Sequence, residues 1–164
     1  MSLSVDRPEA LVVRAIDAER LLFPGDASIT LLADSSATQG HVSVHRAALR
    51  SGMQGASPHH HTTAAEMFYV LSGSVRLLLG DRLVLAREGD VAVVPPGMPH
   101  AFAAAPGCDA ELLVAVTPGI ERFELFRGLA RRSAAAGGDQ SRFDTYGDIS
   151  PLWTGSLERR NHDD

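Results

Sequence analysis

The chain of 164 residues predicts an all-β fold, an antiparallel sandwich or barrel followed by one helix. From about residue 10 to residue 117, short apolar runs are separated by Gly, Pro, Asp and Ser every roughly 8 to 12 residues, as in antiparallel sheets. Helices and strands do not alternate along the chain, and Gly80-Asp81 divides two apolar runs as a hairpin turn would. The length and the even composition predict a single domain.

The expected strands follow from the apolar runs between the turn residues. In chain order they are 11–16, 20–23, 28–33, 41–49, 66–73, 74–80, 82–87, 91–95, 100–105 and 111–116. One turn between them can be assigned a type. Gly80 at the first central position favours a two-residue type II′ hairpin, which would pair 74–79 with 82–87.

After residue 117 the pattern changes from strands to a helix. Thr117 can cap this helix, and Pro118 suits its first position. Apolar residues then recur at a helical interval, with acidic residues early and arginines late as the helix dipole favours: Ile120, Phe123, Phe126 and Leu129, then Glu121, Glu124, Arg131 and Arg132. The helix should end at "AAAGG". Beyond it, four residues can cover the barrel or belong to a loosely attached arm: Phe143, Tyr146, Leu152 and Trp153.

Composition excludes several classes of partner. The formal net charge is −5, and all 15 basic residues are scattered arginines, so we expect no nucleic-acid partner. A single Cys excludes an intrachain disulfide framework. The N-terminus lacks the features of a secretory signal, and no apolar run approaches the roughly 20 residues that span a bilayer. We therefore expect a soluble cytoplasmic protein with no membrane partner.

The segment "SPHHHTTAAEMFYVLSG", residues 57–73, contains the first candidate ligands. Side chains alternate along a strand, so His59 and His61 should share one face while His60 points to the other. Glu66 opens the next strand with Phe68 and Val70 on its face. A carboxylate among apolar groups needs a cation or hydrogen-bond donors, and a metal held by the two histidines would meet that need.

A second cluster supplies a third imidazole. In "GDVAVVPPGMPHAF", residues 89–102, a turn and a short strand lead into Pro95-Pro96-Gly97, which bends the chain. His100 then opens a strand with Phe102 on its face. Each cluster alone is ambiguous, because single histidines on apolar strands are more often structural, but together they predict a metal site.

These two clusters resemble the paired motifs of the cupin superfamily. His59, His61, Glu66 and Gly73 match the first motif, in which four residues separate the second His from Glu and six separate Glu from Gly. Four residues match the second motif at its spacing: Gly89, Pro95, Gly97 and His100. Two positions depart, since Met53 replaces the leading Gly of the first motif and Ala104 replaces the closing Asn of the second.

The resemblance implies an all-β cupin jelly-roll barrel with one C-terminal α-helix. Residues 1–39 would supply flanking strands, 40–117 the barrel core, and 118–164 the helix and tail. The implied cofactor is one divalent ion, Fe, Mn, Ni, Co, Cu or Zn, and the implied ligands are His59, His61, Glu66 and His100. Within the superfamily, the layout most resembles single-domain proteins similar to quercetin dioxygenases.

This resemblance predicts a metal-dependent oxidoreductase, a dioxygenase acting with O₂ on a small aromatic or enolic substrate. It implies that Glu66 also accepts the substrate proton. Three histidines and one carboxylate leave room for further ligands and equally suit a non-redox cyclase, isomerase or lyase. A small-molecule-binding cupin without catalysis is the third alternative.

Other residues have less specific interpretations. Phe68, Val70 and Phe102 are candidates for the substrate pocket as well as for the core. His41 and His45 are interpreted as structural, and Tyr69 should lie outside the barrel. The open edge of the N-terminal strands, residues 10–33, predicts a homodimer.

Overall fold

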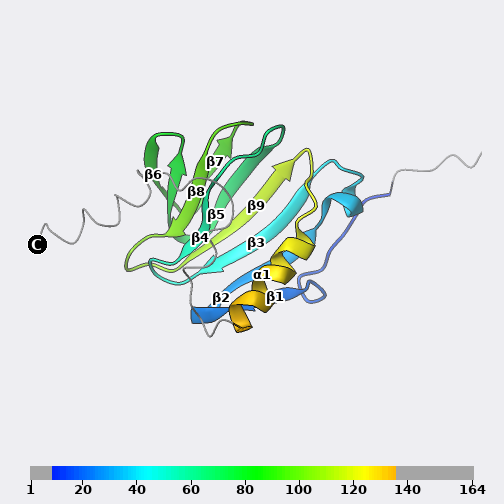
Figure 1. Cartoon of the computed structure of the whole chain (residues 1–164), viewed down its shortest axis with the longest axis horizontal. Helices are drawn as coiled ribbons and strands as arrows, with labels where there is room; N and C mark the ends of the chain where they lie inside the picture. The colour runs from blue at the N-terminus through cyan, green and yellow to red at the C-terminus, as the bar shows by residue number, and fades with distance from the viewer. Residues whose placement is uncertain (1–8, 136–164) are drawn as a thin grey trace, which may run out of the picture.

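The computed structural model describes residues 9–135, which form a curled antiparallel sheet and one helix (Figure 1). The strands are β1 (Arg20–Phe23), β2 (Ala27–Ala33), β3 (Ser43–Leu49), β4 (Gln54–His59), β5 (Ala65–Leu79), β6 (Arg82–Arg87), β7 (Val91–Val94), β8 (His100–Ala104) and β9 (Ala110–Thr117). The helix, α1, spans Phe123–Ala135, and 3₁₀ turns occupy Pro24–Asp26 and Ser35–Thr38. The all-β prediction with one following helix is confirmed.

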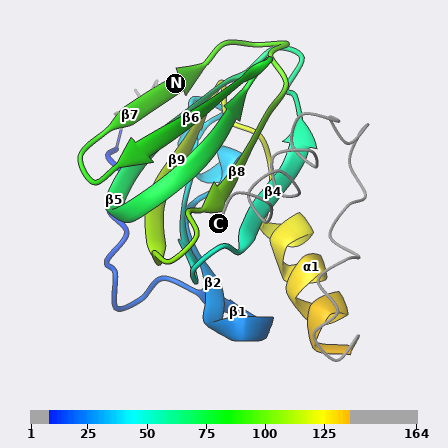
Figure 2. The ribbon, with the colours of Figure 1, turned by 90° about the vertical axis from the view of Figure 1, so that its left-hand side faces the viewer.

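Strand β5 joins the two halves of the sheet. The strand order is β1-β2-β3-β9-β5-β8-β4, and β6 and β7 also pair with β5. Residues 65–73 of β5 pair with β7 and β9, whereas residues 74–79 pair with β6 and β8, so the sheet curls around a shared interior (Figure 2). At the change of partners, Gly73 has φ +74°, and a Cβ there would lie 1.8 Å from the Asp109 carbonyl oxygen. Only glycine permits this bend.

The core lies inside the curl and follows the alternation of the strands. Its fully buried members include Phe68, Val70, Leu77, Leu112 and Val114. Successive side chains on β5 and β9 point to opposite faces, so every second residue enters this interior. Tyr69, which alternates with the core residues, is 39% exposed on the outer face as predicted.

The predicted hairpin at Gly80-Asp81 is confirmed. Leu79 pairs with Arg82, which leaves a two-residue turn. Gly80 has φ +64°, while Asp81 is not among the described residues with positive φ. This is the pattern of a type II′ turn.

Two strand predictions were wrong, one in each direction. Residues 11–16 form no strand, and Leu11, Val12 and Ile16 are 50%, 65% and 93% exposed. Within the described residues β1 pairs with β2 alone, and the run 11–16 does not add a strand to its open edge. In contrast, residues 54–59 contain Gly and Pro and few apolar residues, yet they form β4 because β8 pairs with them.

The helix begins later than predicted, at Phe123 rather than at Pro118. The intervening residues bind to the segment 34–43 instead of to one another. Gly119 N–H donates to the Gly40 carbonyl at 2.8 Å, and Ile120 N–H donates to Ser43 Oγ at 3.3 Å. These bonds hold Gly119 and Ile120 against residues 40 and 43, and the helix starts only after them.

Asp34 determines where the helix starts. Its carboxylate accepts from Arg122 N–H at 2.8 Å and from Phe123 N–H at 3.1 Å. An acceptor for these first donors performs the role of an N-cap from a distant part of the chain. The tail residues predicted as a cover lie outside the described residues. Within residues 9–135, no helix is long and apolar enough to cross a bilayer.

Candidate metal centre

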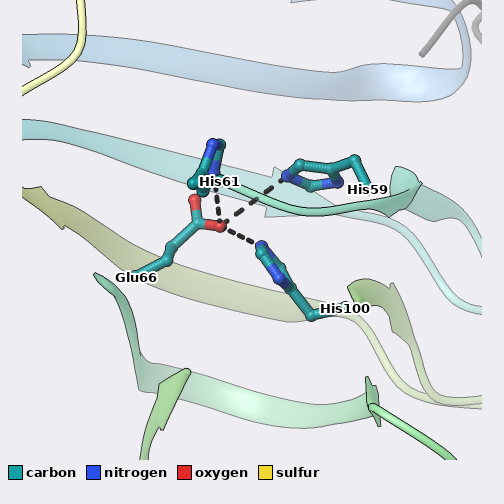
Figure 3. A group of neighbouring side chains, drawn as sticks. All are labelled: His59, His61, Glu66 and His100. Carbon is teal, nitrogen blue, oxygen red and sulfur yellow. Dashed lines mark hydrogen bonds and ion pairs between the residues drawn. The ribbon is translucent and has the colours of Figure 1, made fainter. Parts of the chain in front are cut away.

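Four side chains from three strands and one loop meet inside the curl, as the sequence predicted. His59 ends β4, His61 lies two residues beyond it, Glu66 is the second residue of β5, and His100 opens β8. The register places His59 directly opposite His100. One potential ligand atom from each of the four residues lies within 4.8 Å of the others (Figure 3).

The histidines converge on one carboxylate oxygen, Glu66 Oε2. His61 Nε2 lies 3.2 Å from it, His59 Nε2 lies 3.7 Å from it, and His100 Nε2 is in close contact with it. Glu66 is 2% exposed and His100 is 1% exposed, so the cluster is largely shielded from solvent. Ligand atoms around an ion with bonds of about 2.0–2.2 Å lie at most roughly 4.4 Å apart, so small side-chain shifts would gather the four.

Backbone carbonyls orient two of the imidazoles. His59 Nδ1 lies 2.7 Å from the Ser57 carbonyl oxygen, and His100 Nδ1 lies 2.9 Å from the Met98 carbonyl oxygen. A carbonyl only accepts, so each Nδ1 must carry the proton and donate it. In the neutral rings the Nε2 lone pairs then point at the cluster centre, which is the orientation that metal-ligating histidines require.

The same orientation calls for a cation at the centre. Nε2 lone pairs facing a carboxylate oxygen repel it, and protonating all three rings would instead gather three like charges. His59 Nε2 is buried and has no hydrogen-bond partner within residues 9–135, which is costly for a polar atom. One divalent ion would satisfy all four groups, so the residues present fit a metal.

The environment of Glu66 favours its charged form. Burial would raise the pKa of Glu66, whereas the positive charge of Arg122 lowers it. Arg122 Nη1 donates to the second carboxylate oxygen, Oε1, at 3.1 Å. The two oxygens of Glu66 therefore have different roles, Oε2 toward the histidines and Oε1 toward a guanidinium.

A backbone contact joins the two sequence motifs. Gly97, with φ +80°, donates its N–H to the His61 carbonyl at 2.8 Å, so the Pro-Pro-Gly bend anchors the loop that carries His61. The two positions that depart from the motifs are also neighbours, because Ala104 N–H donates to the Met53 carbonyl at 2.9 Å. Met53 packs on the core and Ala104 is buried, so apolar packing occupies both positions.

The cluster opens into a cavity of about 760 Å³ between the sheet and α1. Phe102, one of the three candidate pocket residues, lines this cavity. Phe68 and Val70 are buried in the core instead, where the Phe68 ring lies 5.9 Å from His100 and 5.4 Å from Phe102. Phe68 therefore supports the wall from behind. His60 is exposed, as the alternation predicted.

Two further polar residues line the cavity, and sequence reasoning did not assign them to the site. Arg122 lies just before α1, with its side chain 13% exposed. His45 on β3 is 6% exposed, and its ring packs on Phe126 with centroids 4.7 Å apart. Burial first and the charge of Arg122 second lower the pKa of His45 to about 3, so this imidazole is neutral. The sequence favoured a structural role for His45, and no local signal marked Arg122.

Comparison with known proteins identifies the fold. Residues 46–116 match the family model described as a cupin domain. No curated protein sequence matches the chain. Among solved structures, the polyketide cyclase RemF from Streptomyces resistomycificus is 22% identical with a TM-score of 0.55, over 67% of this chain and 80% of that one.

Two other solved structures have similar scores. The nucleoside dehydratase Pac13 from Streptomyces is 18% identical with a TM-score of 0.54, over 70% of this chain and 87% of that one. An RmlC-like cupin from Shewanella frigidimarina is 17% identical with a TM-score of 0.59, over 70% and 96%. These TM-scores indicate a shared fold, the jelly-roll barrel that the motifs implied. The matched segment spans all four residues of the metal cluster, so this part of the chain is similar to a cupin domain.

Proposed function

We propose that this protein is a metal-dependent enzyme acting on a small organic molecule. The observation that carries the proposal is the convergence of three imidazoles on Glu66 Oε2, with Nδ1 of two rings held by carbonyls. His59, His61, Glu66 and His100 would hold one divalent ion, and the donor set accepts Fe, Mn, Ni, Co, Cu or Zn. When bound, the ion would polarise a substrate oxygen and, if redox-active, exchange electrons with O₂.

The reaction we propose first is dioxygenation of a small aromatic or enolic compound. The cavity supports this choice because its walls combine the histidine cluster with apolar side chains such as Phe102, Ile29 and Leu125. Such walls bind the apolar body of an aromatic ring and exclude water from the reacting end. As the resemblance to quercetin dioxygenases implies, Glu66 would also accept the acidic proton of the substrate. Oε1 is the oxygen available for that proton, because Oε2 faces the histidines.

A second candidate is a non-redox cyclase, isomerase or lyase. Arg122 and the neutral His45 favour it, because both line the same cavity and can polarise a carbonyl or move a proton without any oxidant. Among the structures of similar fold are a polyketide cyclase and a nucleoside dehydratase, which agrees with this alternative.

Oxygen dependence tests the proposal. The purified protein is loaded separately with each of the six metals and incubated with flavonols, catechols and 1,3-diketones, with and without O₂. We expect turnover only in air, with one O₂ consumed per product and none with Zn²⁺. His41→Ala, at an exposed histidine outside the cavity lining, should retain activity, whereas His59→Ala should lose it.

Equal turnover without O₂, supported by Zn²⁺, would contradict the dioxygenase and favour the second candidate. Tight binding of a compound from the panel without any product would instead favour the binding module.

A further inference from the structure

Arg122 lines the same cavity as the histidines, but it comes from the segment just before α1 and not from a strand. It belongs to the segment 118–122, which Gly119 and Ile120 fasten to residues 40 and 43. A Cβ on Gly119 would approach the Val42 carbonyl carbon to 2.9 Å, so this segment lies against its neighbour as closely as glycine allows. The guanidinium is therefore held on a fixed backbone.

Most of the hydrogen-bonding capacity of this guanidinium remains available. Arg122 Nη1 donates to Glu66 Oε1 at 3.1 Å, and the guanidinium carbon lies 5.3 Å from the centre of the Phe126 ring. Across residues 9–135, Nη1 is the one guanidinium nitrogen of Arg122 with a hydrogen-bond acceptor. Stacking on an aromatic face fixes the plane of the guanidinium and leaves its edge donors to point outward.

The charges around the cavity also favour an anion. Arg122 is the one arginine among the described residues that line it, and the two lining carboxylates are Glu66 and Glu121. Glu66 faces the histidines, and Glu121 is exposed with Oε1 accepting from Ser36 N–H. A divalent ion at the cluster would exceed the charge of Glu66 by one, and Arg122 adds another positive charge beside it. The inner end of the cavity would then have a net charge of about +2, which favours an anionic ligand.

We propose that Arg122 is the anion-binding residue of this cavity and that its ligand is a small aromatic or enolic molecule carrying a carboxylate or enolate. The fork of a guanidinium matches two oxygens of such a group. The remaining walls suit the apolar body of this molecule, since Phe126 and Leu129 line the helix side and Phe102 lines the strand side. This inference rests on the proposed metal site and narrows the substrate class, whichever reaction follows.

Binding of a matched pair of probes to the full chain loaded with Zn²⁺ tests the inference. Benzoate and benzamide have the same ring and nearly the same shape, but only benzoate is charged. We expect calorimetry to give at least roughly tenfold tighter binding of benzoate, as a charge-assisted contact provides. Arg122→Gln should remove this preference, with zinc content unchanged. Arg127→Gln, on α1 but outside the cavity lining, should retain it.

Three results would overturn the inference. Equal affinities of wild type for benzoate and benzamide would do so, and this comparison needs no variant to fold. Unchanged benzoate affinity in Arg122→Gln would show that the anion binds elsewhere. Loss of zinc from that variant at saturating Zn²⁺ would mean that Arg122 acts only by positioning Glu66. These experiments measure binding and not turnover. The anion preference can therefore be found or refuted even if the proposed reaction proves wrong.

Discussion

Two walls of one cavity differ in how the chain holds them in place. The metal wall consists of β4, the start of β5 and β8, and strand register with short local turns places its four ligands. The opposite wall, with Arg122 and Phe126, consists of a segment and a helix fastened to residues 34–43. The first wall is therefore held by the many backbone hydrogen bonds between paired strands, and the second is held by a few specific hydrogen bonds. We expect the two walls to respond differently to mutation.

The largest expected effect comes from removing two ligands of the metal wall. The double variant His59→Ala, His61→Ala should lose most of its metal, because half of the donor set is gone, with affinity falling by roughly a thousandfold or more. Elemental analysis after dialysis against a weak chelator measures this loss. The far-ultraviolet spectrum should remain that of a β protein. Near-stoichiometric metal in the double variant would contradict the assigned centre.

A smaller effect should come from His45, which packs on the second wall. Its pKa of about 3 in the folded protein lies below the usual 6.5. Between these values the unfolded chain binds more protons, so stability falls as the pH decreases from 6.5 toward 3. The loss should reach about 2 kcal/mol at pH 5.

Urea unfolding of the metal-free protein between pH 7 and pH 4.5 measures this dependence. In His45→Leu the curve of stability against pH should be flatter by that amount. Wild-type and variant curves that remain parallel would contradict a neutral, buried His45.

The smallest expected effect concerns the contact that starts the helix. Asp34→Ala removes the acceptor for the Arg122 and Phe123 N–H groups and should cost about 1–2 kcal/mol of stability. Asp34→Asn keeps one acceptor oxygen and should cost less. Both variants should retain full metal content while weakening benzoate binding, because the second wall loosens and the first does not. Parallel losses of metal and benzoate binding would show that the two walls are not independent.

The metal wall could be predicted from sequence because its determinants are local. His59, His61 and Glu66 lie within eight residues of one another, so strand alternation and turn residues predict their positions. His100 follows directly after the Pro-Pro-Gly bend. Pocket residues were harder to assign. Phe102 lines the cavity, whereas Phe68 lies behind it in the core. Alternation assigns both residues to the inward face, but it does not show which of them another side chain separates from the cavity.

The helix and Arg122 show where local reasoning fails. Thr117 and Pro118 have the residue types of a helix start, yet Asp34, 88 residues before Arg122, moves that start to Phe123.

By itself, then, the sequence determined an all-β chain with one following helix and a four-residue set of candidate metal ligands, because strand period and turn residues act over a few positions. The tertiary structure alone decided that 54–59 is a strand, that 11–16 is not, and that Arg122 faces Glu66. Each of these depends on whether a segment far along the chain pairs with the residues in question. Backbone donors and acceptors need hydrogen-bond partners, and such distant pairing can override the local preference of the sequence.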